Sequence, residues 1–189
     1  MAGGKIMYTT AVMQRPQRVL VYFLALTLGA VWIFLSGGKT DRPLRAAPQA
    51  GFAAPEFVLQ TLEGEEYSLS KLKGSAVLVN LWATWCPPCR AEMPAIERVY
   101  REYKSRGFIA LAVNATYQDD PAQLAPFIRE YGLTFPVLLD LSGGTGAAYE
   151  LRALPSSFFI NRDGVIEEVV IGGPMSEALL RARVERLLE

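Results

Sequence analysis

The chain has 189 residues, of which 51% are hydrophobic and 20% are charged, so its composition suits one folded domain with a packed core. Its formal net charge is zero, which gives no general electrostatic case for binding nucleic acid. It has no histidine and only two cysteines, which excludes Ser-His and Cys-His catalysis, a four-ligand zinc site within one chain and the c-type haem motif. We therefore expect no metal and no other cofactor.

The first predicted element is an apolar run without charges at 19–35, with the sequence VLVYFLALTLGAVWIFL. As a helix rising about 1.5 Å per residue, it would be roughly 25 Å long, near the short limit for crossing a bilayer. Tyr22 and Trp32 lie near its two ends, where aromatic residues are common in membrane spans. We therefore predict a cytoplasmic tail at 1–18 and a transmembrane anchor at 19–36.

Two alternatives to an anchor remain, a cleaved signal peptide and a buried helix of a soluble domain. The apolar run is longer than the core of about 7–15 residues that signal peptides usually have. No A-x-A cleavage motif lies between Gly37 and Ala54, and no cysteine is available there for a lipoprotein anchor. Charge alone leaves the orientation open, because three basic residues flank each end of the run: Lys5, Arg15 and Arg18 before it, and Lys39, Arg42 and Arg45 after it.

Residues 37–51 are rich in Gly, Pro and Ala and show no periodicity, which is typical of a linker. Residues 52–189 alternate strand-like runs with helical patterns, which predicts an α/β domain with a mixed sheet and helices on both faces. The predicted elements are, in chain order, a hairpin at 57–69 that turns at Glu63-Gly64, a buried strand at 76–83, a helix at 90–106, a buried strand at 108–115, a helix at 121–131 capped by Asp119 or Asp120, a strand at 135–140, a short helix at 146–151, a hairpin at 156–171 that turns at Asp163-Gly164, and a helix at 176–188 capped by Ser176.

The two cysteines, Cys86 and Cys89, lie between a predicted buried strand and a predicted helix, in the motif CPPC. A helix start presents unpaired N–H groups and the positive end of the helix dipole, so the pKa of a thiol placed there falls. We expect Cys86, at the exposed start of the helix, to be the attacking thiol and Cys89, one turn further, to be the resolving thiol. A metal knuckle and a purely structural disulfide are the alternatives for such a pair.

The cysteine pair stands within N-L-W-A-T-W-C-P-P-C-R-A-E-M-P, which ends at Pro94. Other distinctive stretches are F-V-L-Q-T-L-E-G at 57–64, L-K-G at 72–74, F-P-V-L-L-D at 135–140 and A-L-P-S-S-F-F-I-N-R-D-G at 153–164. From Phe52 onward the chain resembles the TlpA/ResA-like branch of the thioredoxin superfamily, membrane-anchored extracytoplasmic thiol–disulfide oxidoreductases. The resemblance implies a thioredoxin-like fold: a central mixed β-sheet flanked by helices, with an N-terminal hairpin and a central βα insertion.

The resemblance also implies roles for individual residues. Cys86 and Cys89 match the catalytic pair, and Pro155 matches a cis-proline that lies against this pair and meets the substrate backbone. Core packing for Trp85 and an ordinary trans proline at Pro155 are the alternatives. The residues expected to bind substrate are Trp85, Pro87, Leu154 and Pro155.

Asn80 departs from cytosolic thioredoxins, which have a buried Asp six residues before the first cysteine. An amide cannot take up and release a proton in the relevant pH range. In the TlpA/ResA-like branch a Glu six residues after the first cysteine does related work, and here that residue is Glu92. The resemblance implies that Glu92 is a catalytic, partly buried carboxyl with a raised pKa that exchanges protons with the second thiol. A solvated glutamate that stabilises the helix start is the alternative.

The apolar run predicts a single-pass protein of the cell membrane, and the resemblance implies that its catalytic domain lies outside the cytoplasm. Pro87 and Pro88 have no N–H groups to stabilise a thiolate, which favours a reductase over an oxidase. The resemblance implies protein thiol and disulfide clients such as apocytochrome c and an upstream membrane electron donor, and we expect a monomeric domain and no nucleic acid. The alternatives are an extracytoplasmic disulfide oxidase or exchange protein, a non-catalytic module that binds client proteins, and a thiol peroxidase.

Overall fold

The computed structural model describes residues 15–36 and 45–189, with the side chains of the first segment described from 19 to 32. The chain forms two units, Met1–Pro43 and Leu44–Glu189. The first contains helix α1 (Arg15–Ser36), whose described large apolar side chains are exposed. Within the described ranges, no helix reaches both the length and the apolarity required to cross a membrane. Most of the predicted tail at 1–18 lies outside the described residues.

The last part of the predicted linker at 37–51 belongs to the folded unit, whereas residues 37–44 lie outside the described ones. The backbone N–H of Gly51 donates to the carbonyl of Ile166 (2.8 Å), and the N–H of Ile166 donates to the carbonyl of Phe52 (2.9 Å). These ladder-like bonds tie the segment alongside a strand of the sheet, so the unit begins before the predicted boundary at 52.

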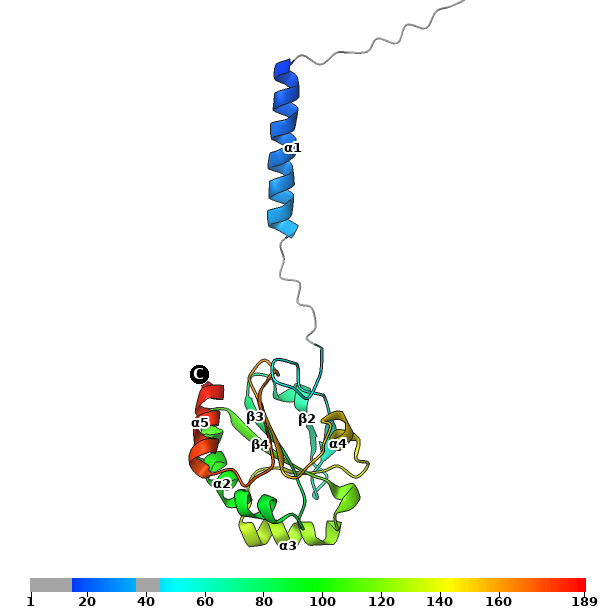
Figure 1. Ribbon diagram of the computed structural model, residues 1–189, viewed down its shortest axis with the longest axis vertical. Coiled ribbons are helices and arrows are strands. Elements are labelled where there is room, and N and C mark those ends of the chain that lie inside the picture. The colour runs from blue at the N-terminus through cyan, green and yellow to red at the C-terminus, as the bar shows by residue number, and fades with distance from the viewer. Residues whose placement is uncertain (1–14, 37–44) are drawn as a thin grey trace, which may run out of the picture. The chain divides into compact units, whose positions relative to one another are not determined.

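A seven-stranded sheet organises the second unit (Figure 1), in the spatial order β2-β1-β5-β4-β3-β6-β7. β4 pairs in parallel with β3 and β5, and the remaining neighbours are antiparallel. The strands are β1 (Val58–Gln60), β2 (Glu66–Ser68), β3 (Ala76–Trp82), β4 (Phe108–Asn114), β5 (Val137–Leu139), β6 (Ser156–Ile160) and β7 (Ile166–Ile171).

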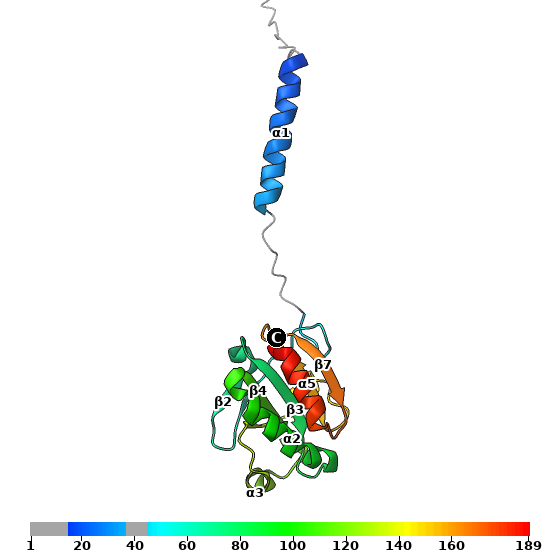
Figure 2. The ribbon, with the colours of Figure 1, turned by 90° about the vertical axis from the view of Figure 1, so that its left-hand side faces the viewer.

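Helices cover both faces of this sheet. α2 and α5 lie side by side across one face (Figure 2), and α4 lies on the opposite side (Figure 1). The helices are α2 (Pro87–Tyr103), α3 (Pro121–Tyr131), α4 (Gly144–Ala148) and α5 (Glu177–Leu188), with 3₁₀ turns at Leu69–Leu72, Lys104–Arg106 and Thr116–Gln118.

Strand β3 is the centre of both hydrophobic cores, because all of its residues are buried. Side chains alternate across a strand. Leu78 and Trp82 therefore pack in the core beneath α2, α3 and α5, whereas Val79 and Leu81 pack in the core on the α4 side. Asn80 has the same parity as Leu78 and Trp82, which directs a polar side chain toward α2.

The predicted α/β class, the mixed sheet with helices on both faces and the N-terminal hairpin are confirmed. The elements α3, β5 and α4 lie between β4 and the final hairpin, in the region where the central βα insertion is predicted. The predicted helix at 90–106 begins earlier, at Pro87, because proline is well suited to the first helical positions, where N–H groups have no intrahelical partner. The short helix predicted at 146–151 lies at Gly144–Ala148. Asp120 rather than Asp119 caps α3, by accepting from the N–H of Ala122 (3.0 Å).

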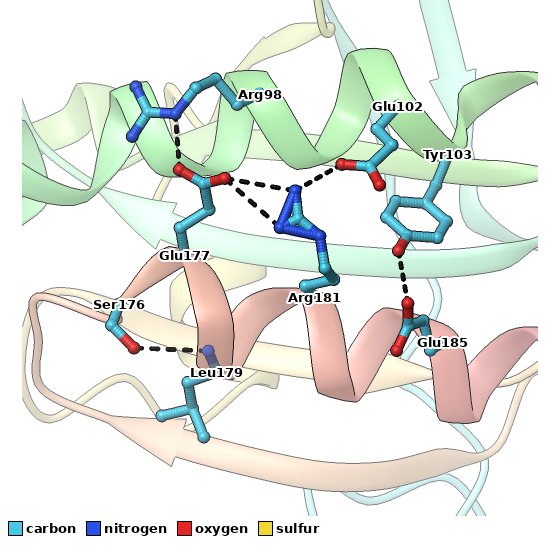
Figure 3. A network of polar contacts seen from close by, with 8 residues as sticks. All are labelled: Arg98, Glu102, Tyr103, Ser176, Glu177, Leu179, Arg181 and Glu185. Atoms are coloured by element: carbon cyan, nitrogen blue, oxygen red, sulfur yellow. Dashed lines mark hydrogen bonds and ion pairs between the residues drawn. The ribbon is translucent and has the colours of Figure 1, made fainter.

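Polar side chains join α2 to the first turns of α5 (Figure 3). The hydrogen bond from Arg98 holds the pKa of Glu177 below its usual range. The contacts fix the start of α5, and with it the loop that precedes the helix, against α2. Between the two helices they are Arg98 with Glu177 (2.6 Å), Arg181 with Glu102 (2.5 Å) and Tyr103 with Glu185 (2.6 Å). Within α5, Arg181 also binds Glu177 (3.2 Å), and the N–H of Leu179 donates to the capping Ser176 (3.3 Å).

Candidate active site

Cys86 and Cys89 form a disulfide at the start of α2, directly beyond the end of β3. Cys86 is the N-cap residue of the helix, and its sulfur accepts a hydrogen bond from the backbone N–H of Cys89 (3.3 Å). The next two residues, Pro87 and Pro88, have no N–H to donate. One backbone donor is therefore directed at the sulfur of Cys86.

The two cysteines differ in access, although less than we predicted. We expected Cys86 at an exposed position, but it is only 3% exposed, and Cys89 is fully buried. This prediction was wrong because neighbouring loops enclose the helix start. Cys86 nevertheless lines a surface groove whose lining excludes Cys89. A partner approaching along this groove meets Cys86 first.

The groove has a volume of about 390 Å³ and separates the cysteine loop from the loop that precedes β6. Trp85 is 56% exposed at its edge, which excludes the core-packing alternative for this residue, and its indole N–H donates to the carbonyl of Gln118 (3.1 Å). The remaining lining residues are Cys86, Pro87, Pro88, Tyr117, Gln118, Leu151, Arg152, Ala153 and Leu154.

The loop before β6 contains the cis peptide bond Leu154–Pro155, as the resemblance implied. Pro155 itself is buried, and its carbonyl accepts from the N–H of Gly172 (2.8 Å). Within residues 45–189, neither the N–H nor the carbonyl of Leu154 forms a backbone hydrogen bond. Leu154, rather than Pro155, therefore has main-chain groups free for a partner.

Glu92 lies on the same helix as the cysteines, three residues after Cys89, so the two side chains lie on one face of α2. Its side chain is completely buried, which excludes the solvated alternative. One carboxyl oxygen accepts from the amide of Asn80 (2.8 Å), and the other accepts from the N–H of Met175 (3.0 Å). Burial raises the pKa of Glu92 above its ordinary value, while these two donors act to lower it.

A second carboxylate, Asp119, holds the cysteine loop, and sequence reasoning treated it only as a possible helix cap. It accepts from the N–H (2.6 Å) and the hydroxyl (2.5 Å) of Thr84, two residues before Cys86. It also accepts from the amide of Asn114 at the end of β4 (2.7 Å). The available signal was an acidic residue shortly after the carboxyl end of a strand parallel to β3, because such ends meet at one edge of a sheet.

Comparison with known proteins places these features in a family. Residues 50–169 match the AhpC/TSA family. A thiol-disulfide oxidoreductase ResA from Halalkalibacterium halodurans is 40% identical over 154 residues, which cover 82% of this chain and 84% of that protein. A putative thiol:disulfide interchange protein DsbE from Chlorobium tepidum has a TM-score of 0.68 at 30% identity, covering 75% of this chain and 99% of its own.

A secreted disulfide oxidoreductase from Mycobacterium tuberculosis has a TM-score of 0.62 at 27% identity, covering 69% of this chain and 95% of its own. The similarity to ResA extends over most of both proteins. The chain therefore belongs to the thioredoxin-like AhpC/TSA family and is a thiol–disulfide oxidoreductase related to ResA.

Proposed function

We propose that this protein is a membrane-anchored extracytoplasmic reductase that acts on disulfides of envelope proteins such as apocytochrome c. One arrangement carries the proposal: Cys86 lines an open groove, Cys89 lies behind it, and a buried carboxyl lies on the same helix face as Cys89. The ResA relative, whose name states thiol–disulfide exchange, supports the reaction class. The reduced dithiol is the active form in this direction.

In the first step, the thiolate of Cys86 attacks one sulfur of the client disulfide. A bond forms between Cys86 and that sulfur, the client S–S bond breaks, and the second client sulfur leaves as a thiolate that takes up a proton. The helix dipole and the N–H of Cys89 stabilise the attacking thiolate. The product is a mixed disulfide between protein and client.

In the second step, Cys89 gives its proton to Glu92 and attacks the sulfur of Cys86. The mixed disulfide breaks, the remaining client sulfur leaves as a thiolate, and the Cys86–Cys89 disulfide forms. The client gains two electrons and the protein loses them. A buried carboxyl with a raised pKa suits this role because its proton affinity approaches that of a thiol more closely than an exposed carboxyl's does.

The groove would orient the client backbone beside Cys86. The free N–H and carbonyl of Leu154 can pair with an extended client segment, as an added strand would. Trp85 and Pro87 supply apolar surface on the opposite side of the groove. Since Pro155 is buried and its carbonyl is already bonded, we assign it to the support of this edge.

The reducing direction rests on the donors around Cys86. Pro87 and Pro88 withhold two N–H groups, and the N–H of Cys89 is the single backbone donor to the sulfur among the described residues. The guanidinium of Arg90 donates to the carbonyl of Thr84 (3.2 Å) and lies 5.2 Å from the ring centre of Phe127, so the contacts of its charge are with these groups rather than with the sulfur of Cys86. Because few hydrogen-bond donors stabilise the thiolate of Cys86, the reduced form is favoured less and the disulfide is a poor oxidant.

The anchor and the compartment rest on the N-terminal sequence and on relatives. The run at 19–35 has no charge, and its described large apolar side chains are exposed. The Mycobacterium tuberculosis relative is described as secreted. An anchor at 19–36 with the domain outside the cytoplasm would place the site among envelope proteins, and an upstream membrane protein would restore the dithiol.

The two thiols have separable roles. Cys86→Ser is expected to abolish insulin reduction, whereas Cys89→Ser is expected to accumulate mixed disulfides because the resolving thiol is missing. Iodoacetamide should label Cys86 faster than Cys89 in the reduced wild-type protein, since only Cys86 lines the groove. Faster labelling of Cys89, measured by peptide mass spectrometry, would contradict the assignment.

The reduction potential distinguishes the reductase from an oxidase. We expect a value near that of thioredoxin, about −270 mV, rather than near that of DsbA, about −120 mV. The measurement is the fraction of free thiols after equilibration with defined dithiothreitol or glutathione buffers. A value above roughly −180 mV would favour the oxidase instead.

Glu92→Gln is expected to slow the resolving step by roughly 10²-fold at neutral pH, because a proton acceptor is lost. Burial favours the protonated form, so wild-type stability falls as pH rises through the ordinary and then the raised pKa of this carboxyl. The variant should therefore gain stability relative to wild type, in urea unfolding, as pH rises above the ordinary pKa of a glutamate. The control is Glu97→Gln, a buried carboxyl on the same helix bonded to Thr134. An exchange profile from pH 5 to 9 that is the same in Glu92→Gln as in wild type would exclude the catalytic role.

The anchor is tested in cells of the native source. The full-length protein should remain with the membranes after carbonate extraction, because an apolar span is held by the bilayer core. Protease added outside intact cells, or spheroplasts where an outer layer blocks access, should degrade residues 52–189. A soluble protein whose N-terminus lies near Gly51 would instead indicate a cleaved signal peptide.

A further inference from the structure

The carboxyl group of Glu92 is held in the core by neutral groups. Its two oxygens accept from the amide Nδ2 of Asn80 on β3 and from the backbone N–H of Met175. Among residues 45–189, no lysine or arginine forms an ion pair with it. An ionised carboxylate in such a site depends on its hydrogen bonds, because neither water nor a counter-ion stabilises the charge.

Asn80 is the side chain that supplies one of these bonds, and its own environment is unusual. It is 1% exposed, and Nδ2 also donates to the hydroxyl of Ser157 on β6 (2.8 Å). Both protons of Nδ2 are thus used, whereas Oδ1 is buried without a partner. An unpaired buried acceptor costs free energy. The reversed amide would direct Oδ1 at Glu92, which is favourable only when that carboxyl oxygen carries a proton.

We propose that Asn80 is a positioning residue that keeps the Glu92 carboxylate oriented and ionisable in the core, with Ser157 accepting the second N–H of the same amide. The proposal rests on the proton-transfer role proposed above for Glu92. It assigns a function to position 80, where cytosolic thioredoxins have a buried Asp. Here the amide of Asn80 donates a hydrogen bond to the carboxyl of Glu92 and does not carry the proton itself.

The second donor, Met175, belongs to a loop that leaves little space around the same carboxyl. A Cβ atom at Gly173 would lie 2.8 Å from Oε2 of Glu92 and 2.8 Å from Cγ of Pro155. Glycine therefore lets the loop pass between the carboxyl and the proline, so that Met175 can reach Glu92. Ser157 stands two residues after Pro155. The residue that binds Asn80 and the loop that binds Glu92 therefore both lie close to Pro155, beside the edge of the groove.

Charged groups on the elements packed against this site are paired with one another. Arg98 on α2 binds Glu177 on α5, and Arg183 on α5 binds Glu168 on β7 (2.6 Å each). The one other titratable group on the same face of α2 near Glu92 is Cys89, which does not titrate in the disulfide form. The oxidised protein therefore reports the proton affinity of Glu92 without coupling to a thiol.

The test is a pH titration of the oxidised full-length protein in detergent micelles, with ¹³C at the glutamate side-chain carboxyl and the Glu92 signal assigned by its loss in Glu92→Gln. Asn80→Ala should raise the midpoint by about one pH unit or more, since a hydrogen bond to a charged group changes an equilibrium by about tenfold. The matched control is Asn114→Ala. It removes a buried asparagine of the neighbouring strand whose amide serves Asp119, so it should lower stability and leave the Glu92 midpoint unchanged.

Two further variants keep the test decisive if Asn80→Ala does not fold. Asn80→Asp preserves the shape but cannot donate when ionised, so Glu92 and the new carboxyl should retain a shared proton to higher pH than wild-type Glu92 does. Ser157→Ala should raise the midpoint by less than Asn80→Ala or Asn80→Asp. A midpoint that does not move in any folded Asn80 variant, or that moves equally in Asn114→Ala, would overturn the proposal.

The titration also separates this proposal from the proposed function. If the midpoint moves in Asn80→Ala while Glu92→Gln exchanges thiols like wild type, Asn80 positions a carboxyl that is not catalytic. If Glu92→Gln is slow but the midpoint is insensitive to Asn80, the catalytic role stands and the positioning role fails.

Discussion

The central position of strand β3 is the constraint on which the site depends. Parallel pairing with β4 and antiparallel pairing with β6 bury the strand on both faces and define where its carboxyl end emerges. The chain leaves this end into the loop that carries Cys86, and α2 then returns across the sheet. The thiol pair is therefore held by a rigid strand behind it and a helix ahead of it, which restricts its geometry more than a mobile loop could.

The same strand carries a buried polar side chain whose burial costs free energy. Asn80 interrupts an apolar stripe that otherwise packs beneath α2, and one end of its amide has no partner. Glu92 adds a carboxyl to this core without a counter-ion. A sequence selected for stability alone would place apolar residues at both positions. Their joint presence, hydrogen-bonded to each other, supports the proposal that this core serves proton chemistry as well as packing.

Access to the site is set by loops from three parts of the chain. Asp119 holds the backbone just before Cys86, and the groove lies between this loop and Leu154. The loop at Gly173 reaches under the same edge and touches Glu92 and Pro155. A client backbone would lie along this edge. Pro155 therefore supports the client-binding edge and also lies against the loop that surrounds the buried carboxyl. These loops make Cys86 less accessible than a cysteine at an exposed helix start would be.

The sequence by itself determined the α/β class, the order of the elements and the cysteine pair at a helix start, because these follow from local periodicity, capping residues and motif spacing. It also pointed to Glu92, through the resemblance rather than through any local pattern. The tertiary structure alone decided that Cys86 is nearly covered, that Leu154 has free main-chain groups, and that Asn80, Ser157 and Met175 converge on one carboxyl. These contacts join residues up to 83 positions apart in the chain. Their existence depends on strand pairing and helix packing, which no local sequence pattern encodes.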